Sequence, residues 1–236
     1  MALKGGAFLA IWHDIDPPQQ EEYMEWHTRE HMPERISIPG FSLGKRLINH
    51  DLSAYQYGTI YCGDELEVFR SSAYLKRLNN PTEWTLRVQP AFRNFLRIAC
   101  ERLASSGFGE GGAAATVRLN FSDGADEARL RGGAKTLADA LLKIKGACCT
   151  HVGLARVDVT DVKTRETELR PEMNEKTFDA LVIVEGSGRP ELEAVVSEIE
   201  NTITSAECNV GSPLTLVHDL AYHLNDSDMV QEREAK

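Results

Sequence analysis

The sequence predicts an α+β protein in which two βαββαβ halves follow one another along a chain of 236 residues. Three observations lead to this fold class. Segments rich in β-forming residues alternate with helical segments, the same order of elements occurs twice, and a glycine-rich stretch separates the two copies. We therefore expect an N-terminal half over residues 1–106, a linker over 107–112 and a C-terminal half with a structural role over 113–236.

Strand and helix signals place the elements of the first half. β-branched and aromatic residues bounded by Pro, Gly, Asn or Asp mark its strands. Asp64 is a suitable N-cap for the second helix, and Pro33 is expected to end the first helix at Met32. The elements expected, in order, are a strand over 6–15, a helix over 19–32, a hairpin of strands over 40–49 and 55–62, a helix over 66–78, a short helical turn within 84–94 and a strand over 95–104.

The second half repeats this order after the linker. Gly132 and Gly133 are expected to interrupt its first helix, because glycine is a poor helix former. The elements expected are a strand over 116–121, a helix over 125–144, a hairpin of strands over 151–160 and 177–185, a helix over 190–204 and a strand over 214–222. Each half leaves one apolar sheet face bare, so the two sheets are expected to pack face to face as an α+β barrel within one chain.

Composition excludes several classes of protein. No apolar run approaches the roughly 20 residues of a membrane span, so we expect a soluble, unprocessed, cytoplasmic protein with no membrane partner. The net charge of −10 and the scattered basic residues argue against nucleic acid as a partner. The five cysteines show no C-x-x-C spacing, which suits a reducing compartment. Because the duplication removes the need to dimerise, either a monomer or a homodimer is compatible with the sequence.

One segment of the first helix departs from ordinary globular composition. With about 100° of turn per residue, Tyr23, His27 and His31 share the inward face of this helix, and Trp26 and Glu30 flank it. Burying an imidazole without a partner costs about 1–3 kcal/mol, so a purely structural helix would carry leucine or valine there. We expect the histidines either to transfer protons as an acid/base pair or to buttress the helix end by bonding to backbone carbonyls or a carboxylate.

The same segment resembles a signature of the dimeric α+β barrel superfamily, whose units are ferredoxin-like, and in particular of EthD-like proteins. The resemblance lies in the run Trp26-His27-x-x-Glu30-His31-x-Pro33-Glu34-Arg35 followed by Ile38-Pro39-Gly40-Phe41. It implies a small cavity between sheet and helices in each half, which holds a small organic ligand. Relatives in this superfamily include small-lactone isomerases, cofactorless monooxygenases, polyketide cyclases and haem-dependent enzymes.

The two halves differ in the helix that would face the cavity. The second half has Leu137, Leu141 and Leu142 where the first half has its histidines. We therefore expect that only the cavity of the first half is equipped for chemistry.

Further side chains are candidates for the same cavity. Tyr23 and Trp26 are expected to shape it around a flat ring. Arg46 would either hold developing negative charge on a substrate oxygen or pair with an acidic residue of the first helix. Glu30 would serve as a base if desolvated, or pair with a neighbouring arginine.

Two candidates lie on or near the predicted hairpin. Tyr57 belongs to an alternating tyrosine stripe that would either pack on the sheet or donate a hydrogen bond to the ligand. His50, like His13, closes a strand and would border the mouth of the cavity or lie at the surface. Residues 27–31 also match H-x-x-E-H, but a zinc site needs a third ligand from another element, and we predict no metal.

These features favour an enzyme that needs no cofactor. We expect an isomerase, lyase or cyclase acting on a small aromatic-derived or lactone-like metabolite, with His27 and His31 transferring protons and Arg46 stabilising negative charge. The alternative is a protein of the same fold that binds a small molecule, haem or a metal without turnover. In either case the expected partner is a small-molecule ligand.

Overall fold

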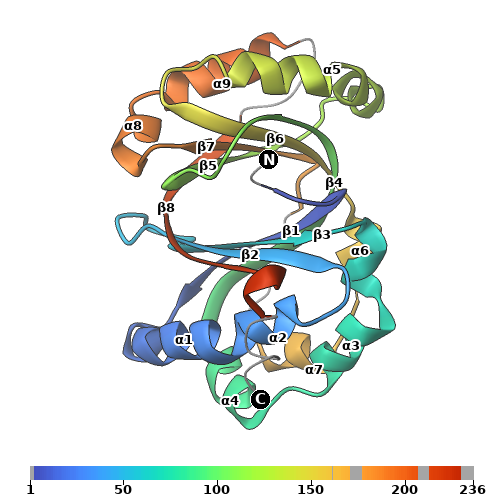
Figure 1. Ribbon diagram of the computed structural model, residues 1–236, viewed down its shortest axis with the longest axis vertical. Helices are drawn as coiled ribbons and strands as arrows, with labels where there is room; N and C mark the ends of the chain where they lie inside the picture. The colour runs from blue at the N-terminus through green and yellow to red at the C-terminus, as the bar shows by residue number, and fades with distance from the viewer. Residues whose placement is uncertain (1–2, 161, 171–176, 207–212, 230–236) are drawn as a thin grey trace.

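Eight antiparallel strands close into one barrel in the computed structural model, which describes residues 3–160, 162–170, 177–206 and 213–229. The order around the barrel is β1-β3-β2-β8-β5-β7-β6-β4, so each half contributes four adjacent strands (Figure 1). The strands are β1 (Ala7–Ile15), β2 (Phe41–Ile48), β3 (Tyr57–Gly63), β4 (Phe92–Gly107), β5 (Ala113–Leu119), β6 (Ala147–Ala155), β7 (Ala180–Gly186) and β8 (Leu214–Asn225). This arrangement confirms the predicted α+β fold of two tandem ferredoxin-like halves.

Two long strands, β4 and β8, join the halves and close the barrel. β4 is 16 residues long and pairs with both β1 and β6, while the 12-residue β8 pairs with both β5 and β2. Because backbone hydrogen bonds continue across both seams, neither half presents an open sheet edge at these seams. The sequence predicts this strand only over 95–104, whereas β4 extends to Gly107. Its last residues, from Cys100 to Gly107, pair with β6 of the second half.

Helices cover two opposite outer sides of the barrel, as Figure 1 shows, and two helices of the second half lie on the same side as those of the first half. In the first half these are α1 (Gln20–Trp26), a π-helical turn (His27–His31), α2 (Met32–Ile36), α3 (Ser72–Asn79) and α4 (Glu83–Val88), with 3₁₀ turns at Pro17–Gln19, Leu66–Arg70 and Gln89–Ala91. In the second half they are α5 (Asp126–Leu141), α6 (Val157–Thr160), α7 (Arg165–Leu169), α8 (Arg189–Glu193) and α9 (Val196–Ser205). Within the described residues no helix is both long and apolar enough to cross a membrane.

Pro33 does not end the first helix, contrary to the prediction. The helix continues to Ile36 because a π turn precedes the proline, and the Met32 N–H donates to the carbonyl of His27 five residues earlier. A proline lacks the N–H that an uninterrupted α-helix would use, so a local change of hydrogen-bond pattern accommodates it. The histidine segment itself therefore forms the irregular turn.

Other helix predictions also needed correction. The helix predicted over 66–78 is divided at Ser71, whose side chain caps α3 by accepting from the Tyr74 N–H. Asp64 is not the cap, because its backbone bonds to the strand ends around it. The glycine pair at 132–133 does not break α5, whose buried leucines and alanines hold it against the sheet.

The connection between β6 and β7 is a long excursion rather than the predicted hairpin turn. β6 ends at Ala155, and the chain then leaves the second half to form α6 and α7, which lie among the helices of the first half in Figure 1. The Arg165 N–H donates to Asn79 Oδ1 at 3.1 Å, and Arg97 Nη2 donates to the carbonyl of Thr160 at 2.9 Å. The second half thus contributes residues to the helix layer of the first.

The barrel interior is largely apolar, and it contains a buried group of charged and polar residues around an ion pair. Lys45 of β2 bonds both carboxylate oxygens of Glu185 on β7, at 2.9 and 2.8 Å, and both side chains are almost fully buried. His151 Nε2 lies 3.6 Å from Glu185 and 3.3 Å from the thiol of Cys149. Burial raises the pKa of Glu185, but His151 and Lys45 outweigh burial and hold this pKa below its usual range. The ion pair therefore links the two halves through the centre of the barrel.

Removing only one member of this pair should destabilise the protein strongly. Lys45→Met leaves Glu185 buried without its cation, and we expect a loss of about 3–5 kcal/mol in the free energy of unfolding. Lys45→Met with Glu185→Gln removes both charges and keeps an acceptor for the N–H of Gly111, so it should recover at least half of that loss. Urea unfolding followed by circular dichroism measures both values. Equal losses in the single and double variants would contradict this account.

Candidate functional site

The π turn places two imidazoles side by side between the first helix and the sheet. His27 is 3% exposed and His31 is 9% exposed, and their ring centroids lie 5.7 Å apart with an interplanar angle of 27°. The ring of Trp26 lies 4.2 Å from that of His31, and the ring of Tyr23 lies 5.3 Å from that of His27. π turns within helices frequently occur at functional sites.

A small cavity adjoins the two imidazoles. Its volume is about 30 Å³, which is room for one or two water molecules. The helix forms one side, and the opposite wall includes Thr59 and Tyr61 of β3 together with His13 of β1. Among the described residues neither His27 Nδ1 nor His31 Nδ1 has a hydrogen-bond partner. Both imidazoles therefore carry a buried polar atom that the protein itself does not satisfy.

The cavity also has a charged wall that the sequence analysis missed. Arg35 of α2 bonds Glu166 of α7 at 2.5 Å and Glu34 at 2.9 Å. Arg170, directly after α7, donates from Nε to Gln89 Oε1 at 2.7 Å and lies near the second carboxylate oxygen of Glu166, at 3.5 Å. Two of these residues come from the excursion of the second half, so nothing in their local sequence links them to the histidine segment.

Electrostatics keep the histidines of the cavity unprotonated. Burial lowers the pKa of His27 well below its usual range, and Arg46 lowers it further. Burial and the nearby Arg35 have the same effect on the pKa of His31. Burial also lowers the pKa of His13 to about 3. At neutral pH all three imidazoles are therefore neutral and able to accept a proton.

Three predicted aromatic residues contact the histidines, and of these only Trp26 lines the cavity. Trp26 lines the cavity and anchors the helix by donating from Nε1 to Thr85 Oγ1 at 3.2 Å. Tyr23 packs behind His27, and its hydroxyl lies 3.2 Å from His13 Nε2. Tyr57 stacks on the ring of His13 at 5.4 Å, on the far side of this aromatic group.

Three other predicted residues do not line the cavity. Arg46 donates to Thr28 Oγ1 at 2.8 Å, and its guanidinium lies 5.3 Å from the ring of Tyr222. Glu30 is half-buried and accepts from Thr82 Oγ1 at 2.5 Å. His50 is exposed, with its ring 5.5 Å from that of Tyr57. Around the H-x-x-E-H pattern, as elsewhere in the described residues, no three His, Cys, Asp or Glu side chains gather as metal ligands.

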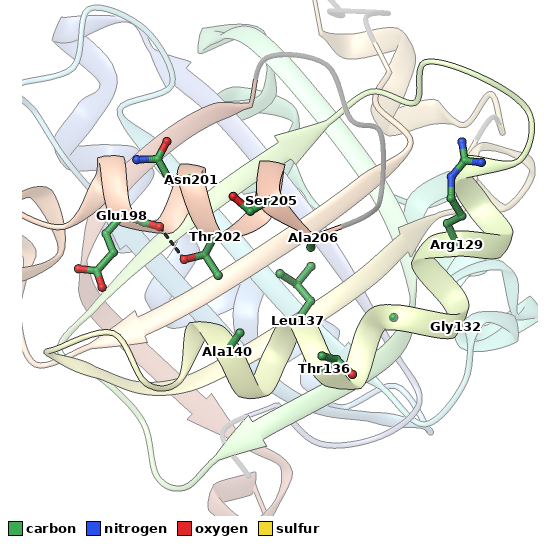
Figure 2. A pocket seen from close by; sticks show the side chains of 11 residues that line it. Arg129, Gly132, Thr136, Leu137, Ala140, Glu198, Asn201, Thr202, Ser205 and Ala206 are labelled. Carbon is green, nitrogen blue, oxygen red and sulfur yellow. Dashed lines mark hydrogen bonds between the residues drawn. The ribbon is translucent and has the colours of Figure 1, made fainter.

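A larger hollow lies in the second half, between α5 and α9 (Figure 2). Its volume is about 960 Å³, and most of its wall consists of small or uncharged side chains. Arg129 lies at one end, where its guanidinium is bound to Asp123 and Asp126. Leu137 is buried in the sheet–helix core beneath the hollow, together with Leu141. The hollow therefore offers space without the titratable groups of the histidine cavity.

Comparison with known proteins identifies the class of fold. No protein-family model matches the sequence, and no curated protein matches it. Among solved structures, an anthrone oxidase-like protein aligns with a TM-score of 0.60 at 12% identity, covering 94% of each chain. A candidate monooxygenase from Fusobacterium nucleatum aligns with a TM-score of 0.58 at 9% identity, covering 94% of this chain and 96% of its own.

A third solved structure of similar fold is an enzyme with a different name. A chlorite dismutase from Candidatus Nitrospira defluvii aligns with a TM-score of 0.54 at 10% identity, covering 97% of this chain and 95% of its own. At such identities the likeness establishes the fold alone. The chain has the eight-stranded barrel of two ferredoxin-like units, which agrees with the dimeric α+β barrel superfamily named from the sequence.

The buried neutral histidines should make stability depend on pH. Below about pH 6 the unfolded chain protonates these histidines, whereas the folded protein, in which their pKa is lowered, does not. Stability should therefore fall as the pH falls, by about 1.4 kcal/mol per pH unit for each such group. His27→Phe and His31→Phe should each lower by about one the number of protons taken up on unfolding, which reduces the slope of the unfolding free energy against pH. Urea unfolding across a pH series measures this slope. An unchanged slope in both variants would show that these rings protonate in the folded protein.

Proposed function

We propose that this protein is an enzyme that transfers protons on a small organic metabolite without a cofactor. The observation that carries the proposal is the pair of buried, neutral imidazoles, each with an unsatisfied Nδ1, beside a small cavity with guanidinium groups in its wall. Neutral imidazoles accept protons, and a nearby guanidinium stabilises the negative charge that deprotonation leaves on an oxygen. His27 and His31 are the proposed proton acceptors.

The pocket in its present form is smaller than such a substrate. Ligand pockets commonly have volumes of roughly 300–1,000 Å³, so binding of an aromatic or lactone ring requires side chains or the α7 segment to move. A negatively charged substrate would also offset the arginines that lower the pKa of the two imidazoles. Substrate binding would thereby make each imidazole a stronger base at the moment of proton transfer.

The fate of the deprotonated substrate divides the proposal into two kinds of reaction. Return of the proton at another atom gives an isomerase, expulsion of a leaving group from the anion gives a lyase, and attack of the anion on a carbonyl of the same molecule gives a cyclase. Reaction of the anion with O₂ would give a monooxygenase, a function favoured by the names of two of the structural neighbours. Membership of the EthD-like family, a cytoplasmic location and a monomeric or homodimeric state remain predictions from the sequence.

Deuterium exchange tests the proton transfer directly. Anthrone and α-angelica lactone are an aromatic ketone and a small lactone with acidic C–H bonds, and their exchange in D₂O is followed by NMR without oxygen. The protein should accelerate exchange of at least one probe, and His27→Ala or His31→Ala should reduce the acceleration by about 10²–10⁴-fold. Exchange at the buffer rate with both probes would contradict the proposal.

A matched control separates the site from the rest of the protein. His223 is half-exposed and pairs with Glu110 far from the cavity, so His223→Ala should retain the wild-type exchange rate. Oxygen uptake with the same probes then distinguishes a monooxygenase from an isomerase. Tight binding of a probe with no exchange would favour the alternative of a non-catalytic binding protein.

A further inference from the structure

Positive charge exceeds negative charge in the wall of the histidine cavity. Three guanidinium groups line it, those of Arg35, Arg97 and Arg170. Two carboxylates oppose them: that of Glu166 in the wall, and that of Glu34, which lies outside the wall and pairs with Arg35. Arg97 donates to the hydroxyl of Tyr74 and to a backbone carbonyl, and neither acceptor carries a negative charge. The neutral histidines contribute no balancing charge.

Arg170 is the group with unused bonding capacity. Its side chain is 6% exposed, and among the described residues its Nη1 has no hydrogen-bond partner. The central carbon of the guanidinium lies over the ring of Phe95, 3.9 Å from the centroid, and this cation–π contact holds the group in place. Burial lowers the pKa of Arg170 to about 10, so the group remains charged at neutral pH.

Glu166 compensates only part of this charge. Its carboxylate is 1% exposed and is shared between Arg35 and Arg170, but its Oε2 accepts no hydrogen bond within the described residues. Buried charges are stable in proteins when they are paired and fully hydrogen-bonded. The cavity thus lacks one anion.

We infer that the ligand of this cavity is a small organic anion whose carboxylate or enolate oxygens bind Arg170. This inference rests on the proposed function in assigning the cavity to a substrate, and it adds the substrate's charge and the residue that recognises it. A planar guanidinium binds two oxygens of a carboxylate at once, which orients the ligand as well as attracting it. The reacting C–H bond would then be directed toward His27 and His31.

Matched acids and amides test the charge of the ligand. Binding of benzoate and benzamide, and of formate and formamide, is measured by calorimetry in chloride-free buffer near neutral pH. The two pairs share shape and differ in charge, and the smaller pair requires the least rearrangement of the cavity. We expect at least one acid to bind about tenfold or more tightly than its amide, the equivalent of one charge-assisted hydrogen bond. Equal binding of acid and amide in both pairs, or binding of neither, would overturn the inference.

Two substitutions in opposite directions make the test specific. Arg170→Met keeps the contact with Phe95 and should abolish the preference for the acid. Glu166→Gln removes the competing carboxylate and should tighten binding of the acid by about tenfold, a gain that a purely structural role would not produce. Arg29→Met, on the exposed side of the first helix, is the control and should bind like the wild type.

The variants also separate this inference from the proposed function. If Arg170→Met does not fold, the gain in Glu166→Gln still decides the matter, and an unchanged or weaker affinity there would overturn the inference. Acid-selective binding without histidine-dependent exchange would leave the inference standing and refute the proposed function. Histidine-dependent deuterium exchange of anthrone or α-angelica lactone, with equal binding of acids and amides, would support the proposed function and refute this inference.

Discussion

Closure of the barrel is the constraint on which the rest of the structure depends. The seams β4–β6 and β2–β8 fix the two halves in one register, and the Lys45–Glu185 pair repeats that connection inside the barrel. Backbone hydrogen bonds cannot slip by one residue without turning every side chain to the opposite face. Strand pairing therefore fixes the position of one half relative to the other. A site built from residues of both halves requires such a fixed arrangement.

The consequence of that fixed register is a composite site. The β6–β7 excursion crosses to the first half and places Glu166 and Arg170 beside the imidazoles of the first helix. In a symmetric pair of identical chains, a partner would have to supply such residues. Because both halves belong to one chain, the second half supplies part of the wall of the first half's cavity and keeps an apolar sheet–helix core of its own.

The cavity departs from ordinary core packing in several respects at once. It combines a π turn, two unsatisfied imidazoles and an excess of guanidinium charge within one small volume. Each of these carries a cost in stability that an apolar core would avoid. These features coincide at one place, while the equivalent helix of the second half carries leucines, and such departures from the rules of core packing are typical of functional sites.

The sequence by itself determined the order of the eight strands and the helix that brings His27 and His31 inward, because hydrophobic periodicity is a local property. It also indicated that the first helix of the second half has leucines at the positions where the first half has its histidines. It did not show the helices α6 and α7 between β6 and β7. The tertiary structure alone decided the π turn that carries the helix past Pro33 and the partners of the cavity. Glu166 lies 131 residues from Arg35, and no local pattern records a contact that depends on how two sheets close into a barrel.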